Sequence, residues 1–92
     1  ILTELIRDTA SVLIPASRDD IAAALQSLRT APLLTGYRGR PGADMDAIID
    51  TAMALQTLVQ DNASALHEIE INPLICRATD AVAADALIRM EE

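Results

Sequence analysis

Three oxygen-bearing side chains recur at every second position of one short apolar segment. Residues 68–74 read Glu-Ile-Glu-Ile-Asn-Pro-Leu. If this segment is a strand, strict alternation places Glu68, Glu70 and Asn72 on one face and the two isoleucines on the other. Burying three such groups without a partner is costly, whereas Mg²⁺, or a phosphate-bearing ligand bridged by it, is a partner that suits oxygen donors. The pattern therefore predicts a site for a hard cation.

A further carboxylate, Asp85, lies in a second apolar run just downstream. Residues 77–80, Arg-Ala-Thr-Asp, suit a four-residue hairpin loop between the two runs. If Cys76 pairs with Ala81, Asn72 lies opposite Asp85, and opposed side chains have Cβ atoms roughly 4.5–5.5 Å apart. An ion about 2 Å from each oxygen would fit between them. The competing interpretation is an amide that caps a turn and a carboxylate that ends a strand facing water.

Three segments in order resemble one protein family. Residues 68–74, followed by a hairpin and Asp85-Ala86, resemble the end of the ATP-grasp domain of ADP-forming (nucleoside-diphosphate-forming) acyl-CoA ligases. The opening residues 1–8 resemble the strand after a Gly-Gly turn in that family, and residues 36–41, Gly-Tyr-Arg-Gly-Arg-Pro, resemble its characteristic loop. The succinyl-CoA ligase β subunit is a more distant relative. One departure is Asp80, where relatives usually have glycine.

The resemblance implies roles for residues along the chain. Asn72 and Asp85 would be the metal ligands that hold Mg²⁺ against the nucleotide phosphates, and Glu70 would be the catalytic acidic residue that completes this shell. Glu68 shares the face but lies further along the strand. Glu4 matches an acidic position that holds the site or contacts the nucleotide; without the resemblance it is equally well a solvated strand residue.

Arg38 and Arg40 flank a glycine in the characteristic loop. Arginine makes forked hydrogen bonds to phosphate or carboxylate, so both are expected to bind the cofactor or another domain. The alternative is a loop arginine paired with Asp44 or Asp46. His67, the only histidine, carries no matching motif and marks a strand start, while Cys76 is expected to be a packing residue.

The resemblance also implies an activity. ATP, a carboxylic acid and CoA would be interconverted with acyl-CoA and ADP through an acyl phosphate and a phosphohistidine. This domain would transfer phosphoryl between ATP or ADP and a histidine carried by a CoA-binding domain or subunit. The isolated chain is expected to be inactive as a ligase. Two alternatives remain open: a regulatory ligase-like module fused to an acetyltransferase, and a non-catalytic partner-binding domain.

Size and composition restrict the protein class. Ninety-two residues allow one small domain, residues 1–92, and the start without methionine suggests a piece of a longer protein. Seven basic against fourteen acidic residues give a net charge of −7, which argues against a nucleic-acid partner. No apolar run reaches the roughly 18 residues of a membrane span. The single cysteine suits a reducing cytoplasm.

The remaining segments supply a scaffold for these residues. Ser17 and Asp44 are expected to cap helices at about 18–29 and 45–60, because each precedes a run of apolar residues at helical spacing. The glycines at 36, 39 and 42 predict a loop over 35–42. Strands are expected at 1–6, 11–14 and in the two C-terminal runs. The order ββααββ predicts an α+β two-layer sandwich, in which two helices cover an antiparallel sheet of about four strands, as an ATP-grasp subdomain fragment.

Overall fold

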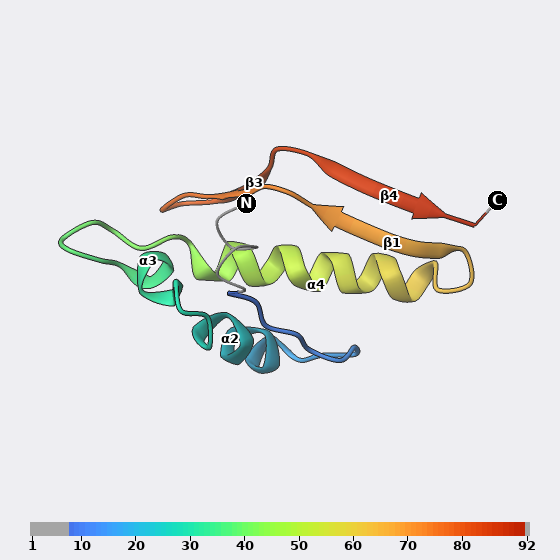
Figure 1. The fold of residues 1–92 in the computed structure, drawn as a ribbon, viewed down its shortest axis with the longest axis horizontal. Helices are drawn as coiled ribbons and strands as arrows, with labels where there is room; N and C mark the ends of the chain where they lie inside the picture. Colours follow the sequence, from blue (N-terminus) through green and yellow to red (C-terminus); the bar gives the residue numbers. More distant parts are fainter. Residues whose placement is uncertain (1–7, 92) are drawn as a thin grey trace.

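The chain folds as a C-terminal strand hairpin lying along a long helix (Figure 1). The structure is a computed structural model in which residues 8–91 are described. Its helices are α2 (Arg18–Gln26), α3 (Ala31–Thr35) and α4 (Met45–Asp61), and its strands are β1 (Leu66–Ile71), β2 (Leu74–Cys76), β3 (Ala81–Ala83) and β4 (Ala86–Met90). Because α4 packs against both the strands and α2, the predicted α+β class is confirmed.

The hairpin has the register predicted from the sequence. Cys76 pairs with Ala81 across the antiparallel β2–β3 ladder. The same register continues through β1 and β4, where Ile71 pairs with Ala86. Each predicted C-terminal strand is divided in two, because Pro73 cannot donate to the ladder and falls between β1 and β2. At the far end a bulge at His67 shifts the pairing by one residue.

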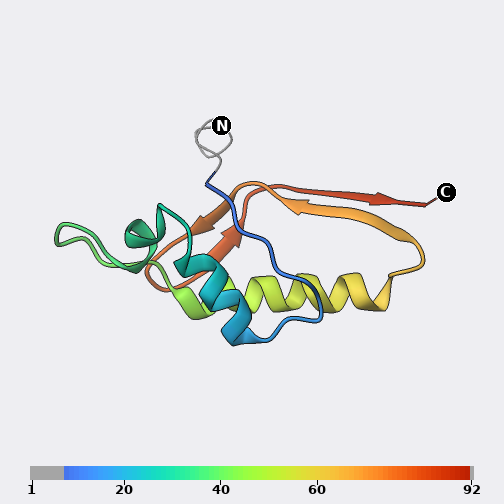
Figure 2. The same cartoon turned by 60° about the horizontal axis from the view of Figure 1, so that its bottom comes forward.

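The strand predicted at residues 11–14 is not present. Residues 8–17 instead run as an irregular segment that crosses α4 on the way to α2 (Figure 2). The segment is fixed to the helix at its end, since the Gln56 side chain accepts from the Ala16 amide at 2.6 Å and donates to its carbonyl at 3.1 Å. The strand predicted at 1–6 lies outside the described residues. Within residues 8–91, the strands form two two-stranded sheets and not one four-stranded sheet.

The first predicted helix begins where expected and ends early. Ser17 forms a capping box with Asp20, which satisfies two backbone amides at the start of α2. The helix ends at Gln26, although residues 18–29 were predicted as helical. The cause is Asp8, whose carboxylate accepts from the backbone amide of Arg29 at 2.7 Å and from Thr30 at 3.0 Å. This contact holds a turn that leads into the short helix α3, which the sequence analysis did not predict.

Asp8 should make the stability of the protein depend on pH in acid. The Thr30 hydroxyl, 2.7 Å away, and the Arg29 amide hold the pKa of this carboxyl below its usual range. A lowered folded-state pKa contributes stability above the unfolded pKa of about 4, and that contribution is lost as the pH falls through the folded pKa. We expect the urea midpoint to fall less between pH 6 and pH 3 in Asp8→Asn than in the wild type. The control is Asp61→Asn, which removes an exposed carboxylate at the end of α4. Its urea midpoint should fall by as much as that of the wild type.

The second predicted helix is present with nearly the predicted bounds, and it contributes to a small aliphatic core. Asp44 caps α4 by accepting from the Ala47 amide at 3.0 Å, and the helix runs one residue beyond the predicted end. Among residues 8–91 the buried apolar residues are Ala16, Ile21, Ala31, Ile48 and Ile49. Three of them, from the irregular segment, α2 and α4, form one cluster. No helix in the described part of the chain is long and apolar enough to cross a membrane.

Candidate metal and nucleotide site

The hairpin places Asn72 and Asp85 opposite each other at the gap between its two ladders. The backbone amide of Asn72 donates to the carbonyl of Asp85 at 3.1 Å. One step further, the Ala84 amide donates to the Pro73 carbonyl at 3.0 Å. These bonds keep the strands paired across the proline. The two side chains therefore start from directly opposed positions, which is the arrangement that the sequence predicts.

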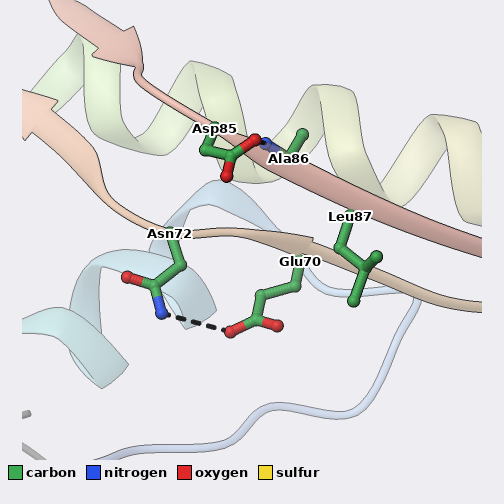
Figure 3. A pocket seen from close by; sticks show the side chains of 5 residues that line it. All are labelled: Glu70, Asn72, Asp85, Ala86 and Leu87. Carbon is green, nitrogen blue, oxygen red and sulfur yellow. Dashed lines mark hydrogen bonds between the residues drawn. The ribbon is translucent and has the colours of Figure 1, made fainter.

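Both side chains, together with Glu70, line one hollow on the outer face of the hairpin (Figure 3). The hollow has a volume of about 170 Å³, and Ala86 and Leu87 complete its lining. The Asn72 amide nitrogen donates to Glu70 Oε1 at 3.3 Å, so its amide oxygen points away from that carboxylate. One oxygen of Asp85 accepts from the Ala86 amide at 2.8 Å.

No basic side chain in the described part of the chain neutralises the two carboxylates of this hollow. Of the ion pairs formed within residues 8–91, none includes Glu70 or Asp85. The donor set therefore consists of two carboxylates and an amide oxygen, which are hard oxygen ligands. No three His, Cys, Asp or Glu side chains of the described residues gather at one point. The set fits Mg²⁺ because this ion is usually held by one or two carboxylates, with the substrate phosphates and water supplying its other ligands.

Glu68 lies on the same face but has a different role. It is directly opposite Arg89 in the β1–β4 ladder, and their side chains form an ion pair at 3.1 Å. The ladder also pairs Glu70 with Leu87, which explains how an exposed leucine comes to line the hollow. Sequence reasoning did not single out Leu87, although the predicted register already placed it opposite Glu70.

Arg38 and Arg40 lie apart from this hollow. They belong to a tight turn at residues 37–40 and line a second hollow that shares no residue with the first. Within residues 8–91 neither arginine forms an ion pair with Asp44 or Asp46; Asp44 caps α4, and Asp46 lies 3.7 Å from Arg18. Their predicted contact with the cofactor stays a prediction.

The other residues considered from the sequence, Glu4, His67 and Cys76, are not among those that line the hollow in the described part of the chain. Glu4 lies outside the described residues, so its predicted contact with the nucleotide stays untested. His67 forms the bulge at the start of β1. Cys76 is half-buried, and burial raises the pKa of its thiol, so that the neutral form is favoured as for a packing residue.

Comparison with known families covers nearly the whole chain. The family model described as an ATP-grasp domain matches residues 1–90 of the 92. The chain therefore belongs to the ATP-grasp domain family.

Within that family the chain is similar to ADP-forming ligases. It is 30% identical over 90 residues to the acetate–CoA ligase (ADP-forming) II subunit beta of Pyrococcus furiosus, covering 96% of this chain and 38% of the relative. It is 29% identical to the acetate–CoA ligase (ADP-forming) II of Archaeoglobus fulgidus, covering 100% of this chain and 13% of the relative. The chain thus spans well under half the length of these relatives.

The same likeness appears in solved structures. The dinucleotide-forming acetyl-coenzyme A synthetase 1 of Ca. Korarchaeum cryptofilum, in complex with coenzyme A and Mg-AMPPCP, matches 99% of this chain and 42% of its own with a TM-score of 0.92 and 27% identity. In that complex a phosphohistidine segment points towards the nucleotide-binding site. The fold of this chain is therefore that of the matching part of an acetyl-CoA synthetase.

Proposed function

We propose that the full-length protein containing this chain is an ADP-forming acyl-CoA ligase. Asn72, Asp85 and Glu70 would hold Mg²⁺ at the nucleotide phosphates. The observation that carries the proposal is the opposed placement of Asn72 and Asp85 beside Glu70 in one hollow. No arginine of the described residues forms an ion pair with the two carboxylates there. The relatives, named as ADP-forming acetate–CoA ligases, support the reaction class.

The chemistry at this hollow is binding and positioning. Phosphoryl transfer requires the reacting groups to be aligned and the negative charge on the phosphates to be neutralised. Bound Mg²⁺ would supply that neutralisation. Asp85 and the Asn72 amide oxygen, fixed by the paired backbone between them, would place the ion. Glu70 would orient the Asn72 amide through the bond at 3.3 Å, which aims its oxygen away from the carboxylate.

The proposed overall reaction converts ATP, a carboxylic acid and CoA into acyl-CoA, ADP and phosphate. The phosphoryl group would pass from ATP to a histidine of a CoA-binding domain or subunit and then to the acid, giving an acyl phosphate that CoA attacks. Nucleotide, CoA and that domain or subunit are the proposed partners. We also infer a cytoplasmic location, since Cys76 is a free thiol.

A labelling experiment tests the proposal. Incubation of the full-length protein, together with its CoA-binding subunit if that is a separate chain, with γ-labelled ATP and Mg²⁺ should give acid-labile phosphate on the histidine-bearing domain or subunit. ADP should discharge this label by re-forming ATP, and a carboxylic acid with CoA should discharge it with formation of acyl-CoA. Nucleotide binding without labelling would contradict the ligase and favour the regulatory module. Absence of nucleotide binding would favour a partner-binding domain.

A further inference from the structure

A tight turn presents two arginines at one end of the molecule. Tyr37 and Arg40 form an isolated antiparallel bridge, and the Arg40 amide donates to the Tyr37 carbonyl at 3.0 Å. The two central residues have positive φ, 51° for Arg38 and 76° for Gly39, as in a type I′ turn. Such a φ is uncommon for a residue other than glycine, asparagine or aspartate. The backbone here is therefore held in one conformation that few arginines adopt.

The rest of the described chain does not neutralise these arginines. Three arginines, at positions 18, 77 and 89, form ion pairs with acids of this chain. Arg38 and Arg40 form none within residues 8–91, although the chain carries a net charge of −7. The guanidinium of Arg38 lies instead 5.2 Å from the centroid of the Tyr37 ring. The turn is thus a local positive patch on an acidic molecule.

Apolar side chains surround the two guanidinium groups. A hollow of about 600 Å³ is lined by Leu33, Tyr37, Arg38, Arg40 and Pro41. Leu33 is 61% exposed and Tyr37 is 48% exposed, so both offer apolar area to a second surface. Tyrosine and arginine in such a setting are the residues that dominate binding between proteins.

The position of the turn makes it accessible to a protein partner. Figures 1 and 2 both show the segment between α3 and α4 projecting beyond the end of the hairpin. A projecting turn is accessible to another domain or subunit, and the hollow beside its arginines can receive side chains of a bound segment. We propose that the turn docks an acidic peptide segment of another domain or subunit, whose carboxylates accept forked hydrogen bonds from Arg38 and Arg40.

Binding of a defined acidic probe tests this docking site. The full-length protein should bind a fluorescein-labelled oligoglutamate peptide, measured by fluorescence anisotropy, and bind an oligoglutamine peptide far more weakly. The double variant Arg38→Asn/Arg40→Gln should raise the Kd for oligoglutamate about tenfold or more. Asparagine tolerates positive φ, so this variant retains the turn, and its thermal midpoint should match that of the wild type.

The control is Arg29→Gln, which removes an exposed arginine outside the turn and should leave the Kd within about twofold of the wild-type value. An unchanged Kd in the double variant would overturn the proposal. Equal binding of oligoglutamine would also overturn it. Full displacement of oligoglutamate by inorganic phosphate or MgATP at matched ionic strength would identify a small-anion site and overturn the protein partner.

Discussion

The Asp85→Asn variant of the full-length protein is expected to lose about 100-fold or more of its nucleotide-dependent phosphoryl transfer rate. The substitution retains the size of the side chain and removes the charge that would attract Mg²⁺ into the hollow. It also removes one of the two carboxylates, Glu70 and Asp85, with which the described residues line the hollow. The rate should recover in part at raised Mg²⁺ concentration, since a weakened site is filled by mass action. Initial rates over a Mg²⁺ titration at saturating ATP measure both effects.

The matched control for this variant is Asp80→Asn. Asp80 is a carboxylate of the same hairpin, but it pairs with Arg77 in the turn and does not line the hollow. Its removal should leave the Mg²⁺ dependence unchanged. A second check is the double variant Asn72→Ala/Asp85→Ala. If both side chains hold one ion, the rate loss of the double variant, expressed as a free energy, should be smaller than the sum of the losses of the two single variants. Equal Mg²⁺ titration curves for Asp85→Asn and Asp80→Asn would refute the metal role.

The register of this site was predictable because local rules decide it. The loop length between the apolar runs leaves few pairings, and the alternation of Glu and Ile selects the one that buries the isoleucines. Two contacts stabilise the turn between β2 and β3. The Arg77 side chain forms an ion pair with Asp80, and the Arg77 backbone amide donates to the Asp80 carbonyl at 2.9 Å. Asp80 thus stabilises the hairpin turn. The ligand arrangement around Mg²⁺ remains a prediction, because side-chain oxygens can turn when a cation binds.

The errors in the fold prediction come from contacts between residues far apart in sequence. The run Ser-Val-Leu-Ile at 11–14 has strong strand propensity, but Gln56, forty residues downstream of Ala16, binds the backbone at the end of that segment. The helix α2, capped by Ser17, ends early because the backbone amide of Arg29 donates to the carboxylate of Asp8, which lies more than twenty residues upstream. Propensity describes only neighbours in the chain, so tertiary partners of this kind cannot be read from it.

The same limit applies to the suggested ion pairs of Arg38 and Arg40 with Asp44 or Asp46. A loop arginine followed closely by two aspartates suggests a local ion pair, and the sequence offers no means of excluding it. The structure uses both acids elsewhere: Asp44 caps α4, and Asp46 lies beside Arg18 from a different helix. An exposed ion pair contributes little free energy, whereas a helix cap contributes about 1 kcal/mol. Asp44 is therefore more stable as the cap of α4 than as the partner of a loop arginine. The consequence is a turn whose positive charge is available to a partner.

Ile49→Ala is expected to lower the free energy of unfolding by about 2–5 kcal/mol, because it deletes a fully packed side chain and leaves a cavity. Ile49 is 7% exposed and joins Ala16 and Ile21 in the central cluster. Only five apolar residues of the described part of the chain are buried, and the sequence has no phenylalanine or tryptophan, so little else there can compensate. The matched control is Leu58→Ala on the same helix, since Leu58 is 40% exposed and should cost about 1 kcal/mol or less. Urea unfolding followed by circular dichroism measures both. Equal losses in the two variants would show that the cluster does not form the core.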